Sequence, residues 1–181
     1  MEFLARNSFE ELTSKTVQLC GLFTDNEFLY LAASPDGLVG EDGILEIKCP
    51  FVAKDTLSAT EAVQNKLLDY CSINDKTGNI ELKKNHNYYY QVIGQLRITQ
   101  RKICYFVIHT TNWTNIQEIK YEEEFWINNM VEKLKLFYLE CMLPEIVNPL
   151  FKLRLLVTDI REPIHIIHAQ KNMKSMVKKK K

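Results

Sequence analysis

The chain has 181 residues, of which 46% are hydrophobic and 25% are charged, and its 23 basic and 23 acidic side chains cancel to a formal net charge of zero. This length suits one domain, or one domain with an appendage, and the composition is that of an ordinary globular protein. No apolar run approaches the length of a membrane span and no secretory signal opens the chain, so no membrane partner is expected. The zero net charge gives no overall sign of a nucleic-acid binder.

The cysteines indicate an intracellular protein with reduced thiols. There are five of them, and no two form a C-x-x-C pair (Cys20, Cys49, Cys71, Cys104 and Cys141). An odd number without clustering favours free thiols over a disulfide framework. The same scatter argues against an iron–sulfur cluster.

The first predicted element is a helix from Glu2 to about Ser14. One stripe of this helix carries an acid and three apolar residues (Glu2, Ala5, Phe9 and Leu12). A carboxylate that faces the core needs a partner there. Two interpretations of Glu2 stay open: an inward acid with such a partner, or an acid in a frayed first turn that the helix dipole favours.

Two strands and a tight hairpin are predicted next. The strands are Val17–Leu22 and Phe28–Ala33, with a turn at Asp25–Asn26 between them. Gly40–Gly43 has turn chemistry, because glycine reaches the positive φ values that a tight reversal needs. After this turn, Ile44–Cys49 is predicted to form a strand that pairs back on the residues before it.

Acidic side chains gather on this hairpin. Strand alternation puts Glu46 and Lys48 on one face and the apolar residues beside them on the other. Closing the turn brings Asp36 almost opposite Glu46, at about 5 Å across the ladder. Two carboxylates this close favour a hard cation such as Mg²⁺, and Lys48 is then placed to orient or help deprotonate a water. The alternative is a surface hairpin whose charged side chains are solvated.

A second group of polar residues is predicted on a helix from Tyr88 to about Arg97. Gln91 and Gln95 lie one turn apart on one face of it. Three successive tyrosines open the helix (Tyr88, Tyr89 and Tyr90). Because successive helical residues cannot share a face, these rings are predicted to alternate between core and groove rather than form a row for base stacking.

The remaining predicted elements are two helices and three strands (Ser58–Asp69, Ile80–Leu82, Ile103–His109, Ile116–Tyr121 and Glu122–Cys141). Ser58 and Glu61 fit a capping box that opens the first of these helices. The strand at Ile103 is nearly continuous apolar sequence, as expected of a strand buried on both faces. The last helix is amphipathic and is expected to end at Pro144.

The pattern changes near the end of the chain. Leu150–His168 is apolar and β-branched, and His165 and His168 have too few neighbouring ligands for a zinc site. The tail Lys171–Lys181 is strongly basic and is predicted to be disordered. It has three interpretations, namely a nuclear-import signal, a nonspecific DNA-binding segment or a plain solvated tail.

The hairpin and the glutamine helix resemble one known family. Pro35-Asp36 followed by Glu46-Ile47-Lys48 matches the PD-(D/E)XK nuclease signature. The sequence SPDGLV…GILEIKCP is similar to the YqaJ-type viral recombinase branch of this nuclease superfamily, which includes lambda-type exonucleases. HNYYYQVIGQLRITQRKICYFVIHT resembles the glutamine-bearing helix and following strand of that branch, and Glu2-x-x-Ala5-x-x-x-Phe9 matches half of another family motif. The resemblance runs from about Glu2 to about Pro144.

This resemblance implies an α/β fold with a restriction-endonuclease-like core, in which helices flank a mixed, partly antiparallel β-sheet. It predicts a YqaJ-like nuclease domain at residues 1–147 and a C-terminal extension with a Lys-rich tail at residues 148–181. Relatives usually carry a further segment before the first helix, with basic and hydroxyl residues that hold a DNA phosphate. The domain is therefore predicted to be N-terminally short.

The same resemblance implies a metal-dependent nuclease. Its ligands for Mg²⁺, or for Mn²⁺ as a substitute, would be three acids and one backbone carbonyl (Asp36, Glu46, Glu2 and the carbonyl of Ile47). Lys48 and Gln91 would position the attacking water. The implied reaction is exonucleolytic hydrolysis of phosphodiester bonds in linear double-stranded DNA, during recombination or repair. The implied partners are DNA ends, further copies of the chain and a single-strand annealing protein.

A different class of function competes with this one. The chain is alternatively a nuclease-derived module that binds DNA or protein without cutting. The zero net charge and the short start favour such a module. The complete set of Asp36, Glu46, Lys48 and Gln91 favours the enzyme.

Overall fold

The structure, a computed structural model, describes residues 1–147 and 163–178. The chain divides into two compact units, Met1–Trp126 and Ile127–Lys181. Within the described ranges, no helix combines the length and the apolar character that crossing a membrane requires. The boundary predicted between residues 147 and 148 falls where the first described range ends, so it stays a prediction.

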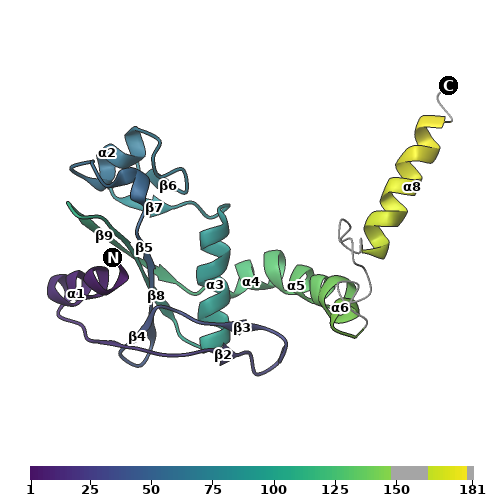
Figure 1. Cartoon of the computed structure of the whole chain (residues 1–181), viewed down its shortest axis with the longest axis horizontal. Helices are drawn as coiled ribbons and strands as arrows, with labels where there is room; N and C mark the ends of the chain where they lie inside the picture. The colour runs from purple at the N-terminus through teal and green to yellow at the C-terminus, as the bar shows by residue number, and fades with distance from the viewer. Residues whose placement is uncertain (148–162, 179–181) are drawn as a thin grey trace, which may run out of the picture. The chain divides into compact units, whose positions relative to one another are not determined.

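The first unit is built on a five-stranded sheet with the order β1-β4-β5-β8-β9 (Figure 1). Its strands are short at one edge and longer towards the other (β1 Val17–Gln18, β4 Gly37–Val39, β5 Gly43–Lys48, β8 Ile103–His109 and β9 Thr114–Lys120). β5 and β8 pair in parallel, and every other pair in this sheet is antiparallel. The predicted α/β fold with a mixed, partly antiparallel sheet is therefore confirmed.

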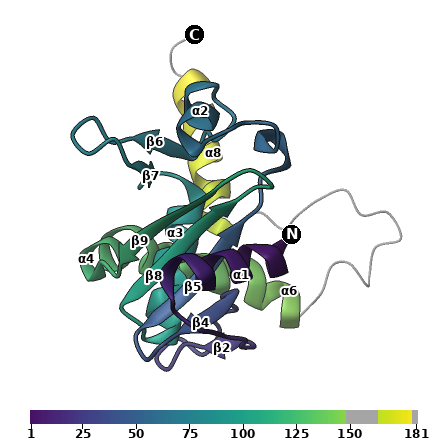
Figure 2. The same ribbon diagram turned by 90° about the vertical axis from the view of Figure 1, so that its left-hand side faces the viewer.

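Helices cover both faces of this sheet. α1 (Glu2–Thr13) lies over one face and α3 (Asn87–Thr99) over the other, as Figures 1 and 2 show from two directions. The core beneath α1 joins helix residues to side chains of the central strands (Ala5, Phe9, Val39, Leu45, Ile47, Tyr105 and Val107). Leu45 and Ile47 therefore point to α1, and strand alternation turns Glu46 to the face covered by α3.

The stripe predicted for α1 is only partly buried. Ala5 and Phe9 are fully buried, and the Phe9 ring lies 5.3 Å from that of Tyr105. Leu12 is 63% exposed, so its predicted place in the core is wrong. Burial in α1 is confined to these two positions in the middle of the helix.

Smaller elements surround the sheet. They are two two-stranded sheets, a 3₁₀ turn and a short helix (β2 Phe23–Thr24 with β3 Ala32–Ala33, β6 Cys71–Ile73 with β7 Ile80–Leu82, Phe51–Ala53 and α2 Ala59–Gln64). The predicted capping box of α2 is confirmed in its first half, since the Ser58 side chain accepts a hydrogen bond from the Glu61 amide (3.1 Å). The Glu61 side chain instead accepts from the amide of Leu57 (2.8 Å), one residue before the N-cap.

The long strands predicted before the hairpin are wrong over most of their length. The Asp25 carboxylate accepts hydrogen bonds from the amides of Glu27 (2.9 Å) and Phe28 (2.8 Å), and the Leu31 amide donates to the Phe28 carbonyl. Local turns thus satisfy backbone groups that a strand would pair with a neighbour. Only two-residue pieces of the predicted strands join a sheet.

The predicted helix at Glu122–Cys141 runs further than expected. α4 (Glu123–Trp126) ends the first unit, and the second unit follows with alternating π-helical and α-helical pieces (Ile127–Val131, α5 Glu132–Phe137, Tyr138–Met142 and α6 Leu143–Val147). Pro144 does not end this run but lies in the first turn of α6, where a missing N–H costs little.

The second unit also contains α8 (Ile164–Lys178). The basic tail is helical up to Lys178 rather than disordered, so that prediction is wrong for this part. Residues 150–162 of the predicted apolar stretch, and residues 179–181 of the tail, lie outside the described residues.

Candidate active site

The β4–β5 hairpin brings two carboxylates to one place. Gly40 takes a φ of +58° in the connecting turn, a conformation that glycine adopts without strain. Gly37 pairs with Leu45, so Asp36 comes next in the register, opposite Glu46, and its amide donates to the Leu45 carbonyl (3.0 Å). Asp36 also accepts a hydrogen bond from the Ile47 amide (2.7 Å). The predicted facing arrangement of Asp36 and Glu46 is confirmed.

Glu46 is the most enclosed charged group of the site, with 3% of its surface exposed. Its Oε1 accepts hydrogen bonds from Lys48 Nζ (2.5 Å) and Gln91 Nε2 (2.8 Å), and its Oε2 accepts one from Gln95 Nε2 (2.7 Å). A buried carboxylate is costly unless it is paired and hydrogen-bonded. Both conditions are met here, because one ammonium and two amides surround the charge.

Gln95 is a site residue that the sequence analysis did not select. It is 4% exposed, and its carbonyl oxygen Oε1 is buried without a hydrogen-bond partner among the described residues. Its position one turn after Gln91 could have identified Gln95 as a site residue, since residues four apart on a helix project in the same direction. Each of the two glutamines donates a hydrogen bond to a different oxygen of Glu46.

Lys48 is held from several sides. Besides its ion pair with Glu46, its Nζ donates to Gln91 Oε1 (3.3 Å). The same nitrogen lies 4.3 Å from the ring centroid of Tyr88, inside the range of a cation–π contact. The Lys48 side chain keeps 19% of its surface exposed, whereas the Glu46 side chain keeps 4%.

The pKa of the Asp36 carboxyl group is raised from 3.8 to about 6. Burial is the largest cause, and the negative charges of Glu46 and Glu2 add to it, while the hydrogen bond from the Ile47 amide and the charge of Lys48 oppose it. Asp36 therefore carries its negative charge at a cost at neutral pH. A cation beside it would relieve that cost.

Glu2 differs from the inward acid of the sequence analysis. Its side chain is 57% exposed and pairs with Arg6 on the next turn of α1 (3.1 Å). Its negative charge nevertheless contributes to the raised pKa of Asp36, after burial and the charge of Glu46. The inward orientation is thus wrong, and a role for Glu2 as an outer acid stays a prediction.

The donor set fits a divalent cation with few protein ligands. Within residues 1–147 and 163–178, no three His, Cys, Asp or Glu side chains gather in the manner of a metal cluster. Mg²⁺, however, takes one or two carboxylates and completes its shell with water and phosphate oxygens. Asp36 and Glu46 supply these two carboxylates. A bound cation would neutralise the negative charge of Asp36, which burial makes unfavourable.

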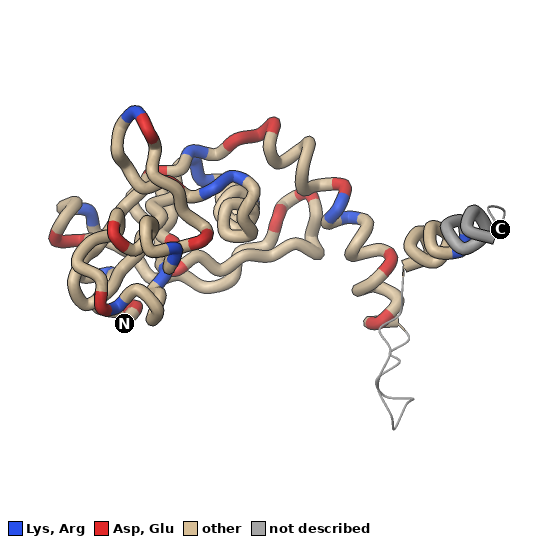
Figure 3. Tube along the Cα trace, turned by 90° about the horizontal axis from the view of Figure 1, so that it is seen from above, with Lys and Arg blue, Asp and Glu red and all other residues tan. Residues whose placement is uncertain are grey.

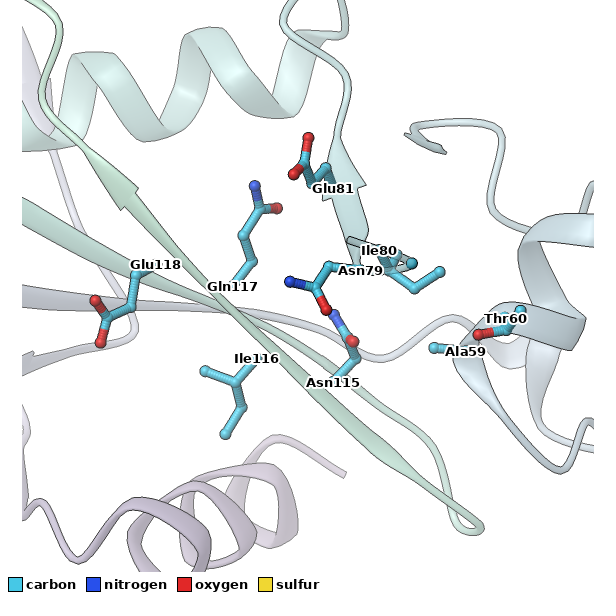
Figure 4. A pocket seen from close by; sticks show the side chains of 10 residues that line it. Ala59, Thr60, Asn79, Ile80, Glu81, Asn115, Ile116, Gln117 and Glu118 are labelled. Carbon is cyan, nitrogen blue, oxygen red and sulfur yellow. The ribbon is translucent and has the colours of Figure 1, made fainter. Parts of the chain in front are cut away.

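A separate pocket of about 430 Å³ lies at the β9 edge of the sheet (Figure 4). Its walls come from β9, from β7 and the turn before it, and from the start of α2 (Ala59, Thr60, Gly78, Asn79, Ile80, Glu81, Asn115, Ile116, Gln117 and Glu118). None of these residues is basic, so the pocket lacks the charge that would attract a phosphate. It contains none of the residues of the candidate site (Asp36, Glu46, Lys48, Gln91 and Gln95).

A comparison with protein-family models matches residues 1–102 to the YqaJ-like viral recombinase domain. The chain belongs to this family. The matched residues include the whole β4–β5 hairpin and both glutamines of α3. The resemblance seen in the sequence is therefore confirmed.

Solved structures give a related result. The chain is similar to LHK-Exo in complex with dAMP, with 25% identity, a TM-score of 0.51 and coverage of 70% of this chain and 57% of that one. It matches a second structure, of the alkaline exonuclease LHK-Exo from Laribacter hongkongensis, with the same identity, TM-score and coverage of this chain, and with 58% of that chain covered. The protein thus spans less than two thirds of the length of these exonucleases. No curated protein gave a match.

Proposed function

We propose that this protein is a Mg²⁺-dependent DNA nuclease, with Mn²⁺ as an alternative ion, and that it acts as an exonuclease on linear double-stranded DNA. The observation that carries the proposal is the buried Glu46 carboxylate, which lies opposite Asp36 and is held by Lys48, Gln91 and Gln95. Membership of the YqaJ-like family and the similarity to an alkaline exonuclease support it.

The roles follow from the contacts of each side chain. Asp36, Glu46 and the backbone carbonyl of Ile47 would hold the cation, which when bound supplies a Lewis acid for the phosphoryl oxygen and lowers the pKa of a water. Lys48, the ammonium closest to Glu46, would orient the attacking water.

The remaining residues would act through these groups. Gln91 bonds both Glu46 and Lys48, so it would help to orient both groups. Gln95 would orient the other oxygen of Glu46. Glu2 would contribute only through its charge, as an outer acid.

The wider assignments are part of the same proposal. Residues 1–147 would form the nuclease domain and residues 148–181 an extension to it. The substrate would be DNA ends generated in recombination or repair, and the partners would be other copies of the chain and a single-strand annealing protein. Lys and Arg residues are interspersed with Asp and Glu residues along the trace of the described residues (Figure 3). The cation would supply local positive charge for the phosphate.

One observation favours a second candidate, a module that binds DNA or protein without cutting. Both oxygens of Glu46 already accept hydrogen bonds from the protein, so a cation competes with Lys48 and the two amides for this carboxylate. The charge cost at Asp36 favours the enzyme, because a bound cation would relieve this cost at neutral pH.

End-labelled linear duplex and a covalently closed circle, each with Mg²⁺ and with EDTA, distinguish these functions. An exonuclease degrades the linear duplex with Mg²⁺ and spares the circle, because it needs an end. EDTA should abolish cutting, and Lys48→Met should abolish it while Lys76→Met, at an exposed lysine, should not. Equal cutting of the circle would point to an endonuclease, and binding without cutting would establish the second candidate.

A further inference from the structure

The ring of Tyr88 forms one wall of the candidate site. Lys48 Nζ lies 4.3 Å from its centroid, a separation at which the negative face of an aromatic ring attracts a cation. The two residues come from different elements, β5 and α3, so this contact ties the strand that carries Glu46 to the helix that carries both glutamines.

Three further rings fix the orientation of Tyr88. Its centroid lies 5.1 Å from that of Tyr70 at an interplanar angle of 72°, and 4.8 Å from that of His86 at 69°. Phe106 of β8 approaches it at 6.4 Å. The contacts with Tyr70 and His86 are edge-to-face, an arrangement that aromatic rings prefer, and they hold the Tyr88 ring in one orientation. Tyr88 therefore cannot turn away from Lys48 without breaking this cluster.

The backbone at Tyr88 is fixed as well. His86 caps α3, and its Nδ1 accepts a hydrogen bond from the Tyr88 amide (3.2 Å). The next two tyrosines take no part in the site, because Tyr89 and Tyr90 each pack edge-on against Phe125 at 5.0 Å. Of the three successive tyrosines, Tyr88 is thus the one whose ring contacts Lys48.

We propose that Tyr88 is a positioning residue that holds the ammonium of Lys48 between Glu46 and Gln91. This inference rests on the proposed nuclease function. It adds Tyr88 as the residue that positions Lys48 in the proposed active site. A lysine side chain is a point charge on a flexible four-carbon stem, so directional hydrogen bonds alone leave it free to move. The aromatic face limits that movement. Because Lys48 already lies over this ring, Tyr88 is assigned to the lysine rather than to stacking with a DNA base.

Substitutions at Tyr88 separate the ring from its hydroxyl group. Tyr88→Phe keeps the aromatic face and should cut DNA at close to the wild-type rate. Tyr88→Leu removes the face and should lower kcat by about tenfold with little change in KM. Tyr90→Leu is the matched control, since it removes a ring from the same helix that contacts Phe125 and not Lys48.

A series of fluorinated phenylalanines at position 88 makes the test independent of packing. Fluorine withdraws electron density from the ring face and hardly changes its shape, so kcat should fall steadily with the number of fluorines. A purely structural role predicts no such trend. A flat series, or Tyr88→Leu at the wild-type kcat, would overturn the inference.

A second measurement works without DNA. The acylation rate of Lys48 in the metal-free protein, read by mass spectrometry against exposed Lys76, should rise several-fold in Tyr88→Leu and in the most fluorinated variant, and stay low in Tyr88→Phe. Equal rates in all variants would overturn the role of Tyr88. If the wild-type protein fails to cut DNA at all, the proposed function fails, and the labelling result decides the inference on Tyr88 by itself.

Discussion

At the scale of single residues, the arrangement around Glu46 is the most informative feature. Its carboxylate is almost completely buried and accepts hydrogen bonds from Lys48, Gln91 and Gln95. Hydrogen bonds to a charged group contribute more to stability than neutral ones, and removing one partner leaves the other unsatisfied. The same contacts therefore stabilise the fold and set the orientation of the proposed metal ligand.

Gln95 tests this coupling between stability and activity. Gln95→Met keeps the volume of the side chain but removes the donor to Glu46 Oε2, so the free energy of unfolding should fall by about 1–3 kcal/mol. Nuclease activity should fall as well, because Glu46 loses its fixed orientation. Chemical denaturation of this variant beside Gln64→Met, at an exposed position of α2, measures the effect. Wild-type stability and activity would show that Gln95 does not support Glu46.

The raised pKa of Asp36 predicts that the stability of the metal-free protein depends on pH. Its pKa is raised in the folded state from 3.8 to about 6, so the folded protein binds this proton more tightly than the unfolded chain. The resulting stabilisation is complete below about pH 3.8 and is lost as the pH rises through about 6.

Asp36→Asn removes the titrating group but keeps an acceptor for the Ile47 amide. In EDTA, the wild type should lose stability between pH 4 and pH 7, whereas the Asn variant lacks this titration. The free energy of unfolding of the variant minus that of the wild type should therefore increase over this range by about 1–2 kcal/mol, after allowance for screening by water. Denaturation at several pH values measures this difference. An advantage that does not change with pH would contradict the raised pKa.

At the scale of elements, the site depends on how the hairpin is fixed to the helix that faces it. Arg101 follows α3 and donates from Nη1 to the carbonyls of Gly40 (2.7 Å) and Gly43 (2.8 Å), at the two ends of the hairpin turn. These bonds link the end of the glutamine helix to the strand pair that carries Asp36 and Glu46.

Arg101→Met should loosen this link. The free energy of unfolding should fall by about 1–2 kcal/mol, because two charge-assisted hydrogen bonds are lost at a partly exposed position. Lys102→Met is the matched control, since its ion pair with Asp42 is exposed and should contribute less than about 0.5 kcal/mol. Thermal denaturation compares the two variants. A larger loss in the Lys102 variant would contradict the role given to Arg101.

The parts of the fold and site that local pattern determines were predictable. The β4–β5 hairpin follows from its glycine turn and strand alternation, and these also place Asp36 opposite Glu46. Contacts between distant segments were not predictable in this way. The donation of Gln95 to Glu46 and the approach of Tyr88 to Lys48 depend on how α3 packs against β5, which periodicity does not specify.

Two errors have a similar origin. The apolar run at Phe28 gave a strand pattern, but the buried Asp25 carboxylate binds the amides that a strand would have paired. The stripe through Glu2 correctly predicted the burial of Ala5 and Phe9, yet periodicity carries no information on where along a helix the contact with the sheet ends.

At the scale of the whole molecule, charge is a local property of this protein. Its formal net charge is zero, so it lacks the overall positive charge that steers many proteins to DNA. We propose instead that DNA is cleaved at one site in the first unit, within the residues that match the YqaJ-like family. Substitution of a proposed metal ligand at this site should therefore abolish DNA cleavage.

The most direct test is a Mg²⁺ titration of linear-duplex cleavage by the wild type, Glu46→Gln and Glu118→Gln. Glu118 lies on β9 outside the site, and its variant controls for the loss of one acidic charge. We predict Mg²⁺-dependent cleavage by the wild type and by the Glu118 variant, and none by the folded Glu46 variant at any Mg²⁺ concentration. Cleavage by the Glu46 variant at the wild-type rate would contradict the assignment of the active site.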